Sequence, residues 1–546
     1  MSLGKAPPHQ DMFHTSADIC DEELADTSIY KLLHRECHRL FPDEAFADLF
    51  QDVGRRSVPP RIVAVVMVLQ RFEGLSDREA VDHFKFDLRW KYAAGGLSFD
   101  YPGFVHTVLV DMRARLRASV RPDRIFDVVL DVAKAAGLIG RRRVLDSTAL
   151  YDAVATQDTV TMIRSSIRAL LKAAPEPLAA ELRSVLKRDD DYTSPGKPAC
   201  NWDDEAAREA LVDALARDAH AVLAELDDRA LSPEVKQAAD LVATVVGQDL
   251  EQRDDGVFRI ARRVAPDRVI STVDPEARHG HKTSARGFDG YKGHVAIDPD
   301  SELITRSAVS AANAGDASVA QALLADVLEA DANKTDLDET SQASSSTDVA
   351  PATSTTAVCE PSKPEVYGDA SYGTADLVER LEGANVKVQP PSAREGLFSQ
   401  EAFEIDSSAG TACCPNGVRV RLRVLPDNSR TADFASHCAG CSLREQCTTS
   451  KSGRVLRLHP KHQTLTRARE AQRDPSWKQR YRATRPKVER KIAHLMRTRH
   501  GGRRARLRGR VRIGHDFAML AAAVNLYRLA VLGDPSRNPG ASESTL

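Results

Sequence analysis

Hydrophobic positions recur with helical spacing over two long regions of the chain. In residues 59–120 an apolar run follows Pro60, and Ser76 with Glu79 three residues later has the pattern of a capping box. Residues 157–255 are rich in Ala, Leu, Arg and Glu and read as several amphipathic helices. Both regions are therefore expected to be helical.

Strand patterns are shorter and lie between the helical regions. They occur at 141–150, at 287–313 (YKGHVAID and ELITRSAVS, joined by Pro-Asp-Ser as in a hairpin), at 364–368 and at 386–392. Amphipathic helices are predicted at 316–330 and after Thr374. Strands followed by alternating helices and strands predict an α/β fold with one hairpin and later crossover helices.

These patterns divide the chain into parts with different expected roles. The predicted parts are a helical region, 1–130; an α/β core, 140–156 and 256–399; a helical insertion, 157–255; a disordered Ser/Thr-rich loop, 332–363; a Cys-rich insertion, 400–460; and basic C-terminal helices, 461–535, that complete the core. Compact helix pairs such as those in 59–120 often bind DNA, and a plain helical bundle explains the same pattern equally well.

Composition and charge narrow the class of protein. A hydrophobic content of 42% supports folded cores, and neither a secretory leader pattern nor an apolar run of about eighteen residues is found, so we expect a cytoplasmic protein without membrane contact. The net charge of −2 hides an asymmetry: fifteen Lys or Arg residues and one acid, Glu489, lie between Lys478 and Arg512. With so little acid nearby, most of these cations are expected to face solvent or a polyanion.

Cysteines cluster late in the chain. Five of the nine lie between Cys413 and Cys447. In a reducing compartment this clustering favours a metal site over disulfides. Four thiolates would suit a structural, tetrahedral Zn²⁺ of the zinc-ribbon kind: Cys414, Cys438, Cys441 and Cys447. His437 is a rival ligand, and free cysteines in a core are the alternative.

Three carboxylates are candidates for a second, harder metal site. Asp146 is carried by the first strand, and Asp369 follows the strand at 364–368, a position that also suits a turn or capping aspartate. Pro486 starts a helix on which Glu489, Ile492, Ala493 and Met496 share one stripe, expected to face the protein body. Glu489 could be an internal ion-pair partner there. Together the three acids could hold one or two Mg²⁺ or Mn²⁺ ions.

At this point the chain resembles the DDE insertion-sequence transposases of bacteria. The resemblance rests on LSDREAVDHFKFDLRW, VLDST, DPEARHGHKTSARGFDGYKGHVAID, YGDASYGT, the Cys-bearing insertion and ERKIAHLMRTRHGGRRARLRGR. A Tyr–Arg–Glu context on a helix is matched by Tyr481, Arg485 and Glu489, with three rather than two residues between Tyr and Arg. The basic residue usually found one to two turns after the Glu is replaced by Met496, beside Arg497.

The resemblance implies a ribonuclease-H-like mixed sheet in which the first and fourth strands are neighbours. It implies catalysis by Asp146, Asp369 and Glu489 with bound Mg²⁺ or Mn²⁺, cleavage of double-stranded DNA at the element ends, attack of the freed 3′-OH on target DNA, and self-association on DNA at the nucleoid. The residues expected to contact DNA are Tyr481, Arg485, Arg490, Lys491, Arg503, Arg504, Arg506, Arg508 and Arg510. A catalytically inactive, zinc-containing DNA-binding regulator and a stand-alone nuclease of the same fold are the alternatives.

Overall fold

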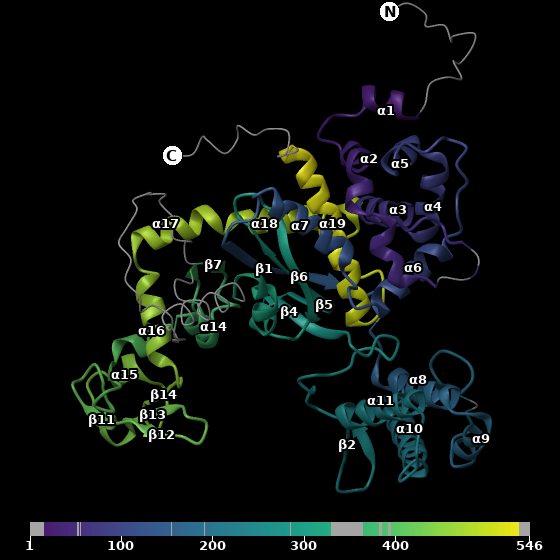
Figure 1. The fold of residues 1–546 in the computed structure, drawn as a ribbon. Coiled ribbons are helices and arrows are strands. Elements are labelled where there is room, and N and C mark those ends of the chain that lie inside the picture. Colours follow the sequence, from purple (N-terminus) through teal and green to yellow (C-terminus); the bar gives the residue numbers. More distant parts are fainter. Residues whose placement is uncertain are drawn as a thin grey trace, which may run out of the picture.

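The computed structural model describes residues 16–533, with gaps at 52–53, 55, 154–155, 191, 284–285, 329–363, 382–384 and 391–394. The Ser/Thr-rich segment 332–363 lies outside the described residues. A mixed sheet occupies the centre of the molecule, and helices surround it (Figure 1). None of the described helices combines the length and the apolar character that a membrane span requires.

The N-terminal helices form where the sequence predicts them. Ser76 and Glu79 make the expected capping box, and Pro60 opens its helix. The elements are α1 (Ser16–Glu23), α2 (Ile29–Leu40), the 3₁₀ helix η1 (Asp43–Leu49), α3 (Pro60–Glu73), α4 (Asp77–Phe86), α5 (Leu88–Ala93), α6 (Thr107–Ala118) and α7 (Arg124–Ala135).

The central sheet runs in the order β6–β5–β1–β7–β8, and β4 extends it as a hairpin with β5. The pairs β1–β5 and β5–β6 are antiparallel, whereas β1–β7 and β7–β8 are parallel. The strands are β1 (Arg142–Tyr151), β4 (Arg278–Thr283), β5 (Arg286–Ile297), β6 (Ile304–Ala311), β7 (Glu365–Gly368) and β8 (Asn385–Val386). The predicted mixed α/β fold, the hairpin and the pairing of the first and fourth strands are thus confirmed.

The helix expected at 316–330 forms in pieces: a 3₁₀ turn, η2 (Asp316–Val319), then α12 (Ala320–Leu323) and, after a turn at Leu324, a further helical segment at 325–328. Residues 329–330 lie outside the described residues. The strand expected at 386–392 is shorter: it is paired only in β8, residues 387–390 form no strand, and Pro390 has no N–H with which to extend the ladder. Residues 391–392 lie outside the described residues. The crossover helix α14 (Ala375–Arg380) follows β7 as predicted.

One hydrophobic core joins the N-terminal helices, one face of the sheet and the last helix, α19 (Arg510–Leu532). A side chain at Gly293 would come within 2.8 Å of the Phe517 ring, so β5 and α19 touch closely. Buried Asn525 of α19 accepts a hydrogen bond from Ile304 N and donates one to Ile304 O, both at 2.8 Å. The last helix of the chain is therefore shared by the helical region and the sheet.

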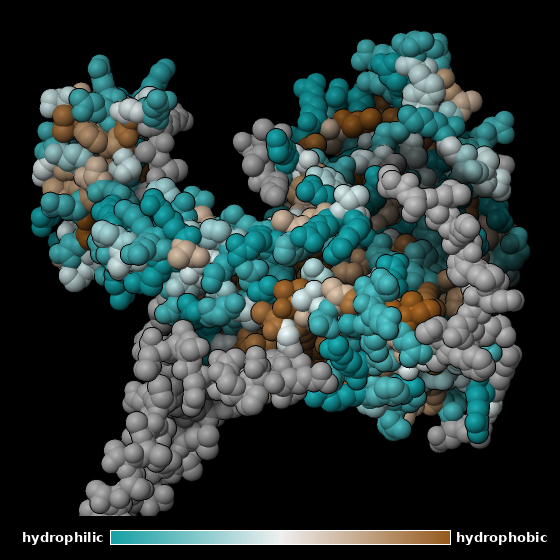
Figure 2. Space-filling view, turned by 90° about the horizontal axis from the view of Figure 1, so that it is seen from above, coloured by the Kyte–Doolittle hydropathy of each residue, from teal (hydrophilic) through white to brown (hydrophobic). Residues whose placement is uncertain are grey.

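The helical segment after β1 and the cysteine-rich lobe (residues 398–458) each have a core of their own. The first contains α8 (Thr159–Ala173), α9 (Glu176–Ser184), α10 (Glu205–Glu225), α11 (Pro233–Asp249), β2 (Leu250–Gln252) and β3 (Phe258–Ile260). The lobe contains η3 (Gln400–Ala402), β9 (Glu404–Asp406), β10 (Thr411–Cys413), β11 (Arg419–Arg421), β12 (Arg423–Val424), β13 (Arg430–Asp433), η4 (Ala435–His437), α15 (Arg444–Cys447) and β14 (Val455–Leu458). Figure 2 shows this lobe standing apart from the rest of the molecule.

The chain returns from the lobe to the sheet through helices. These are α16 (His462–Ala471), α17 (Pro475–Thr484), α18 (Pro486–Leu495) and the 3₁₀ helix η5 (Thr498–His500), which lead to α19. In Figure 1, α16 and α17 lead away from the lobe, and α18 crosses the sheet, where it packs against β1.

Candidate active site

Two of the predicted acids meet at one edge of the sheet. Strands β1 and β7 are parallel, with Val144 paired to Tyr367, and each aspartate lies two residues beyond its strand's member of that pair. Adjacent strands are about 4.8 Å apart, so Asp146 and Asp369 lie at the same level on neighbouring segments. The side chain of Asp146 is 13% exposed and that of Asp369 is 40% exposed.

The third acid reaches the same place from α18. Arg485, the residue before this helix, holds the group together: its Nη2 is 2.8 Å from Asp146 Oδ1 and 3.9 Å from Asp369 Oδ2, and its Nη1 is 3.7 Å from Glu489 Oε1. The Arg485 side chain is only 9% exposed. The structure therefore brings all three acids together around one buried guanidinium.

The electrostatics of this group are unbalanced, since three carboxylates face one cation. Burial raises the pKa of Asp146, and the positive charge of Arg485 opposes that rise. For Arg485, burial alone would lower the pKa, but the charge of Asp146 and the hydrogen bond to it outweigh burial and raise the pKa. Arg485 Nη1 is buried without a hydrogen-bond partner among the described residues. With three carboxylates and one guanidinium, the group keeps a net negative charge that a further cation could offset.

The donor chemistry fits a hard divalent ion, because Mg²⁺ and Mn²⁺ prefer carboxylate oxygens. As arranged, however, no group of three or more His, Cys, Asp or Glu side chains in the described part of the chain is set to bind a metal. At the three acids, the Arg485 guanidinium lies within ion-pair distance of each carboxylate. Metal binding there would require Arg485 to give way.

Backbone and aromatic contacts fix the position of these groups. Ser147 N donates to Asp146 Oδ1 at 2.8 Å, which orients the carboxylate. Tyr481 Oη donates to Gly368 O at 3.2 Å, next to Asp369. The Tyr481 ring stacks on Trp477, with ring centroids 4.9 Å apart. Tyr481 thus ties α17 to the end of β7 and is half-buried.

A buried polar network that the sequence did not point to lies beside Asp146. Ser147 Oγ donates to Asp316 Oδ2 at 2.6 Å, and Lys292 Nζ lies 2.8 Å from Asp316 Oδ1. His294 contacts Tyr372 Oη at 3.1 Å, and burial lowers the pKa of His294 to about 4. Lys292 and His294 lie two residues apart on β5, so the sequence could have indicated that their side chains share one face of the strand. Nothing in the sequence around Asp316 indicated that it belongs to this network.

The stripe predicted for α18 is wrong by about one position. Its buried residues are Val488, Lys491 and Leu495, whereas the Glu489 side chain is 62% exposed. The expectation placed the acid inward because Glu489 shares the i, i+3, i+4, i+7 spacing with Ile492, Ala493 and Met496. Here the long aliphatic stem of Lys491 packs in the core. Glu489 lies beside the buried face of α18 and reaches the site from there.

The basic run is also more internally paired than its local composition suggested. Arg485 pairs with the three acids, Arg490 pairs with Glu302, and Arg506 donates to Leu75 O. Glu302 lies far away in the sequence, in the β5–β6 turn, so a count of neighbouring acids missed it. Of the residues predicted to contact DNA, Arg503, Arg504, Arg508 and Arg510 are exposed and form no ion pair with a described residue. Two backbone hydrogen bonds hold the loop 503–505 against Tyr151, at the end of β1.

Among the residues predicted to contact DNA, Lys491 is the least accessible from outside the protein. It is 1% exposed, and burial lowers its pKa to about 8, with repulsion from Arg528 adding to the effect of burial. An ammonium in this position does not reach a DNA backbone.

Replacement Lys491→Met is expected to stabilise this core by up to about 3 kcal/mol at pH 7. The methionine side chain is similar in size to that of lysine but carries no charge that has to be buried. The folded pKa lies below the unfolded value of about 10.4, so the unfolded wild type binds more protons between pH 8 and 10.4. Wild-type stability therefore rises with pH across that window, and the advantage of the variant fades. Hydrogen exchange of the α18 amides at both ends of the window measures this; protection that is lower in the variant at pH 7 contradicts it.

The four predicted zinc ligands are neighbours. Cys438 and Cys447 are buried in the core of the cysteine-rich lobe, and Cys414 packs against that core. All four cysteines line one small cavity together with His437. Burial raises the pKa of Cys447, and interactions with Cys438, Cys414 and Cys441 add to the rise. All four are free thiols, and in the described part of the chain they are not arranged as a metal site.

Two family models match the chain, at opposite ends. One, described as a transposase DDE domain, matches residues 413–530, which include Glu489 and the four cysteines but not Asp146 or Asp369. The other, described as a transposase domain (DUF772), matches residues 25–115. No curated protein and no solved structure matches the chain. Since both matches are to transposase domains and both matched regions contribute to one hydrophobic core, the chain belongs to the insertion-sequence DDE transposases.

Proposed function

We propose that this transposase family member cuts DNA at the ends of an insertion sequence and joins the freed ends to target DNA in a reaction that depends on divalent metal ions. One observation carries the proposal: carboxylates from two adjacent strand ends and a helix converge on a single buried arginine. Three carboxylates around one base leave a net negative charge, which suits a divalent cation that takes carboxylate oxygens as ligands.

A ribonuclease-H-like core is part of the same proposal. Its support is the strand order β6–β5–β1–β7–β8, with three antiparallel-linked strands followed by two parallel ones. In this arrangement the first and fourth strands of the core deliver Asp146 and Asp369 to one edge.

Asp146, Asp369 and Glu489 would hold one or two Mg²⁺ or Mn²⁺ ions. When bound, such ions activate water and stabilise the attacking and leaving oxygens of a phosphodiester. The chain's own contribution is positioning: β1 and the Ser147 N–H fix Asp146, while Tyr481 holds the end of β7 that carries Asp369. Arg485, once displaced from the carboxylates, would be free to neutralise a phosphate of bound DNA.

DNA would lie across the end of β1. The exposed residues Arg503 and Arg504 are anchored there; Arg508 follows in the same loop, and Arg510 begins α19. We assign the N-terminal helices, within residues 1–130, to recognition of the element ends, and we expect the chains to associate on DNA, at the nucleoid. The segments 157–255 and 400–460 are proposed as insertions into the catalytic core, because each has a core of its own.

The cysteine-rich lobe is proposed to bind one structural Zn²⁺ through Cys414, Cys438, Cys441 and Cys447. Four thiolates close the coordination sphere, so the metal would stabilise the lobe and take no part in catalysis. Elemental analysis is expected to find one zinc per chain and protection of these thiols from alkylation. Zinc-free protein whose four thiols react in the native state would contradict the site.

The experiment for the proposed function uses the full-length chain and DNA from both sides of its coding region as the donor. With Mg²⁺ we expect cleavage at the element ends and joined products in a target plasmid, and with EDTA we expect binding only. Binding without cleavage under any metal would favour the inactive regulator. Cleavage without joined products would favour the nuclease.

A further inference from the structure

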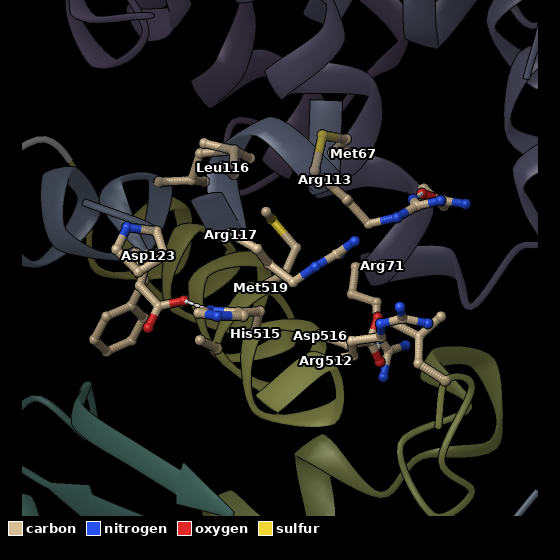
Figure 3. A pocket seen from close by; sticks show the side chains of 16 residues that line it. Met67, Arg71, Arg113, Leu116, Arg117, Asp123, Arg512, His515, Asp516 and Met519 are labelled. Atoms are coloured by element: carbon tan, nitrogen blue, oxygen red, sulfur yellow. Dashed lines mark hydrogen bonds and ion pairs between the residues drawn. The ribbon is translucent and has the colours of Figure 1, made fainter. Parts of the chain in front are cut away.

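A pocket between the N-terminal helices and α19 carries more positive charge than the chain neutralises. Its walls come from α3, α6, α7 and α19, and its volume is about 40 Å³. Figure 3 shows Arg113 and Arg117 from α6 and Arg512, His515 and Asp516 from α19 gathered around it. These residues belong to parts of the chain that are nearly 400 positions apart, so the pocket exists only in the folded protein.

Both carboxylates that line this pocket already have partners: Asp516 pairs with Arg71 at 3.1 Å, and Asp123 Oδ1 lies 2.7 Å from His515 Nδ1. Arg113 pairs with Asp77, which does not line the pocket. Arg117 and Arg512 line the pocket, and no carboxylate in the described ranges lies within ion-pair distance of either. Burial lowers the pKa of Arg117, and the charges of Arg512 and Arg113 lower it further, so the guanidinium groups repel one another.

The surroundings favour a small anion as the missing partner. Met67, Leu116 and Met519 form apolar parts of the wall, which reduce the screening of the arginine charges. The volume holds only a few water-sized groups, enough for phosphate oxygens and too little for a whole nucleotide. The pocket also adjoins the basic loop, because Leu507 lines it and Arg508 and Arg510 follow.

We propose that Arg117 and Arg512 together bind a backbone phosphate of duplex DNA, at the junction of the N-terminal helices with α19. The inference rests on the proposed function, since it assumes that the chain binds DNA. One DNA backbone would then contact the loop 503–510 first and the two arginines next, toward the N-terminal helices. Their role is positioning: a phosphate contact fixes the register of the DNA and reads no sequence.

The test is DNA binding by the full-length chain in EDTA, measured by fluorescence anisotropy of a labelled duplex over a range of salt concentrations. The variants are Arg117→Gln, Arg512→Gln and the double substitution. Arg115→Gln is the matched control, because Arg115 lies on the same helix over the Phe50 ring and does not line the pocket. Melting curves establish that each variant is folded.

For one phosphate shared by both arginines, the slope of log affinity against log salt is expected to fall by roughly 0.9 in the double variant, and affinity at 0.1 M salt by about tenfold. Each single variant should show part of this loss, and Arg115→Gln none. A double variant with the wild-type slope overturns the proposal, as does an equal loss in the control. Binding of inorganic phosphate that depends on both arginines, with an unchanged DNA slope, would make the pocket a site for a free anion and overturn the DNA assignment. A wild-type chain that binds no duplex would refute the proposed function itself.

Discussion

Replacing Asp146 by Asn is expected to reduce DNA cleavage by at least about a thousandfold, equivalent to roughly 4 kcal/mol of barrier. The amide keeps the shape of the side chain and can still accept the hydrogen bond from Ser147 N. It loses the negative charge that a hard divalent ion requires. The measurement is the rate of donor-end cleavage in Mg²⁺ and in Mn²⁺, with DNA affinity measured in EDTA.

The same direction is expected for Asp369→Asn and for Glu489→Gln. Glu489→Gln is the cleaner variant, because this side chain is 62% exposed and its loss should leave the fold intact. Asp376→Asn on α14 is the control: it removes an exposed carboxylate that pairs with Lys461, outside the three-acid group. DNA affinity within about twofold of wild type is expected in all of them. Full activity in Glu489→Gln would remove the third acid from the metal site and leave the two aspartates.

Arg485→Gln is expected to have opposite effects on stability and on metal binding. Without metal, the variant leaves the buried Asp146 unpaired, which costs about 3 kcal/mol or more. At the same time it removes a positive charge within 4 Å of all three carboxylates. Two unit charges at that distance interact by about 4 kcal/mol near a protein surface, and a divalent ion doubles the repulsion.

Affinity for Mn²⁺ in the absence of DNA should therefore rise at least about tenfold in Arg485→Gln, by more than 1.4 kcal/mol. Calorimetric titration measures the affinity, and melting curves in EDTA and in Mn²⁺ should show a larger metal-dependent stabilisation than in wild type. Arg490→Gln serves as control, since it breaks a pair with Glu302 away from the acids. Weaker Mn²⁺ binding in Arg485→Gln would mean that the arginine helps to form the ion site rather than occupying it.

Sequence reasoning succeeded where local pattern and strand pairing determine the structure. The strand that carries Asp146 and the one that precedes Asp369 were recognisable as short apolar runs, and the parallel register of β1 and β7 then brings their ends together. The capping box at Ser76 was predictable for a similar reason, since both partners lie within one turn.

Sequence reasoning failed where burial depends on a long side chain, or where pairing depends on a partner that is distant in the sequence. Lys491 is buried because its aliphatic stem fills a core position, which its charge disguised. The pairing of Arg490 with Glu302 and of Ser147 with Asp316 joins residues that only the folded sheet makes neighbours. The position of Arg485 among three acids was likewise beyond a count of nearby charges.

The shared core around α19 has a consequence for how copies of this gene can decay. This helix supplies buried side chains both to the sheet and to the N-terminal helices, and Asn525 fastens it to β6. A premature stop codon anywhere before its last turns would expose part of the core under the N-terminal helices as well as the catalytic sheet. Truncated copies should therefore be degraded as whole proteins and not survive as separate DNA-binding repressors. An inactive copy that persists would be expected to carry point substitutions and to retain its full reading frame.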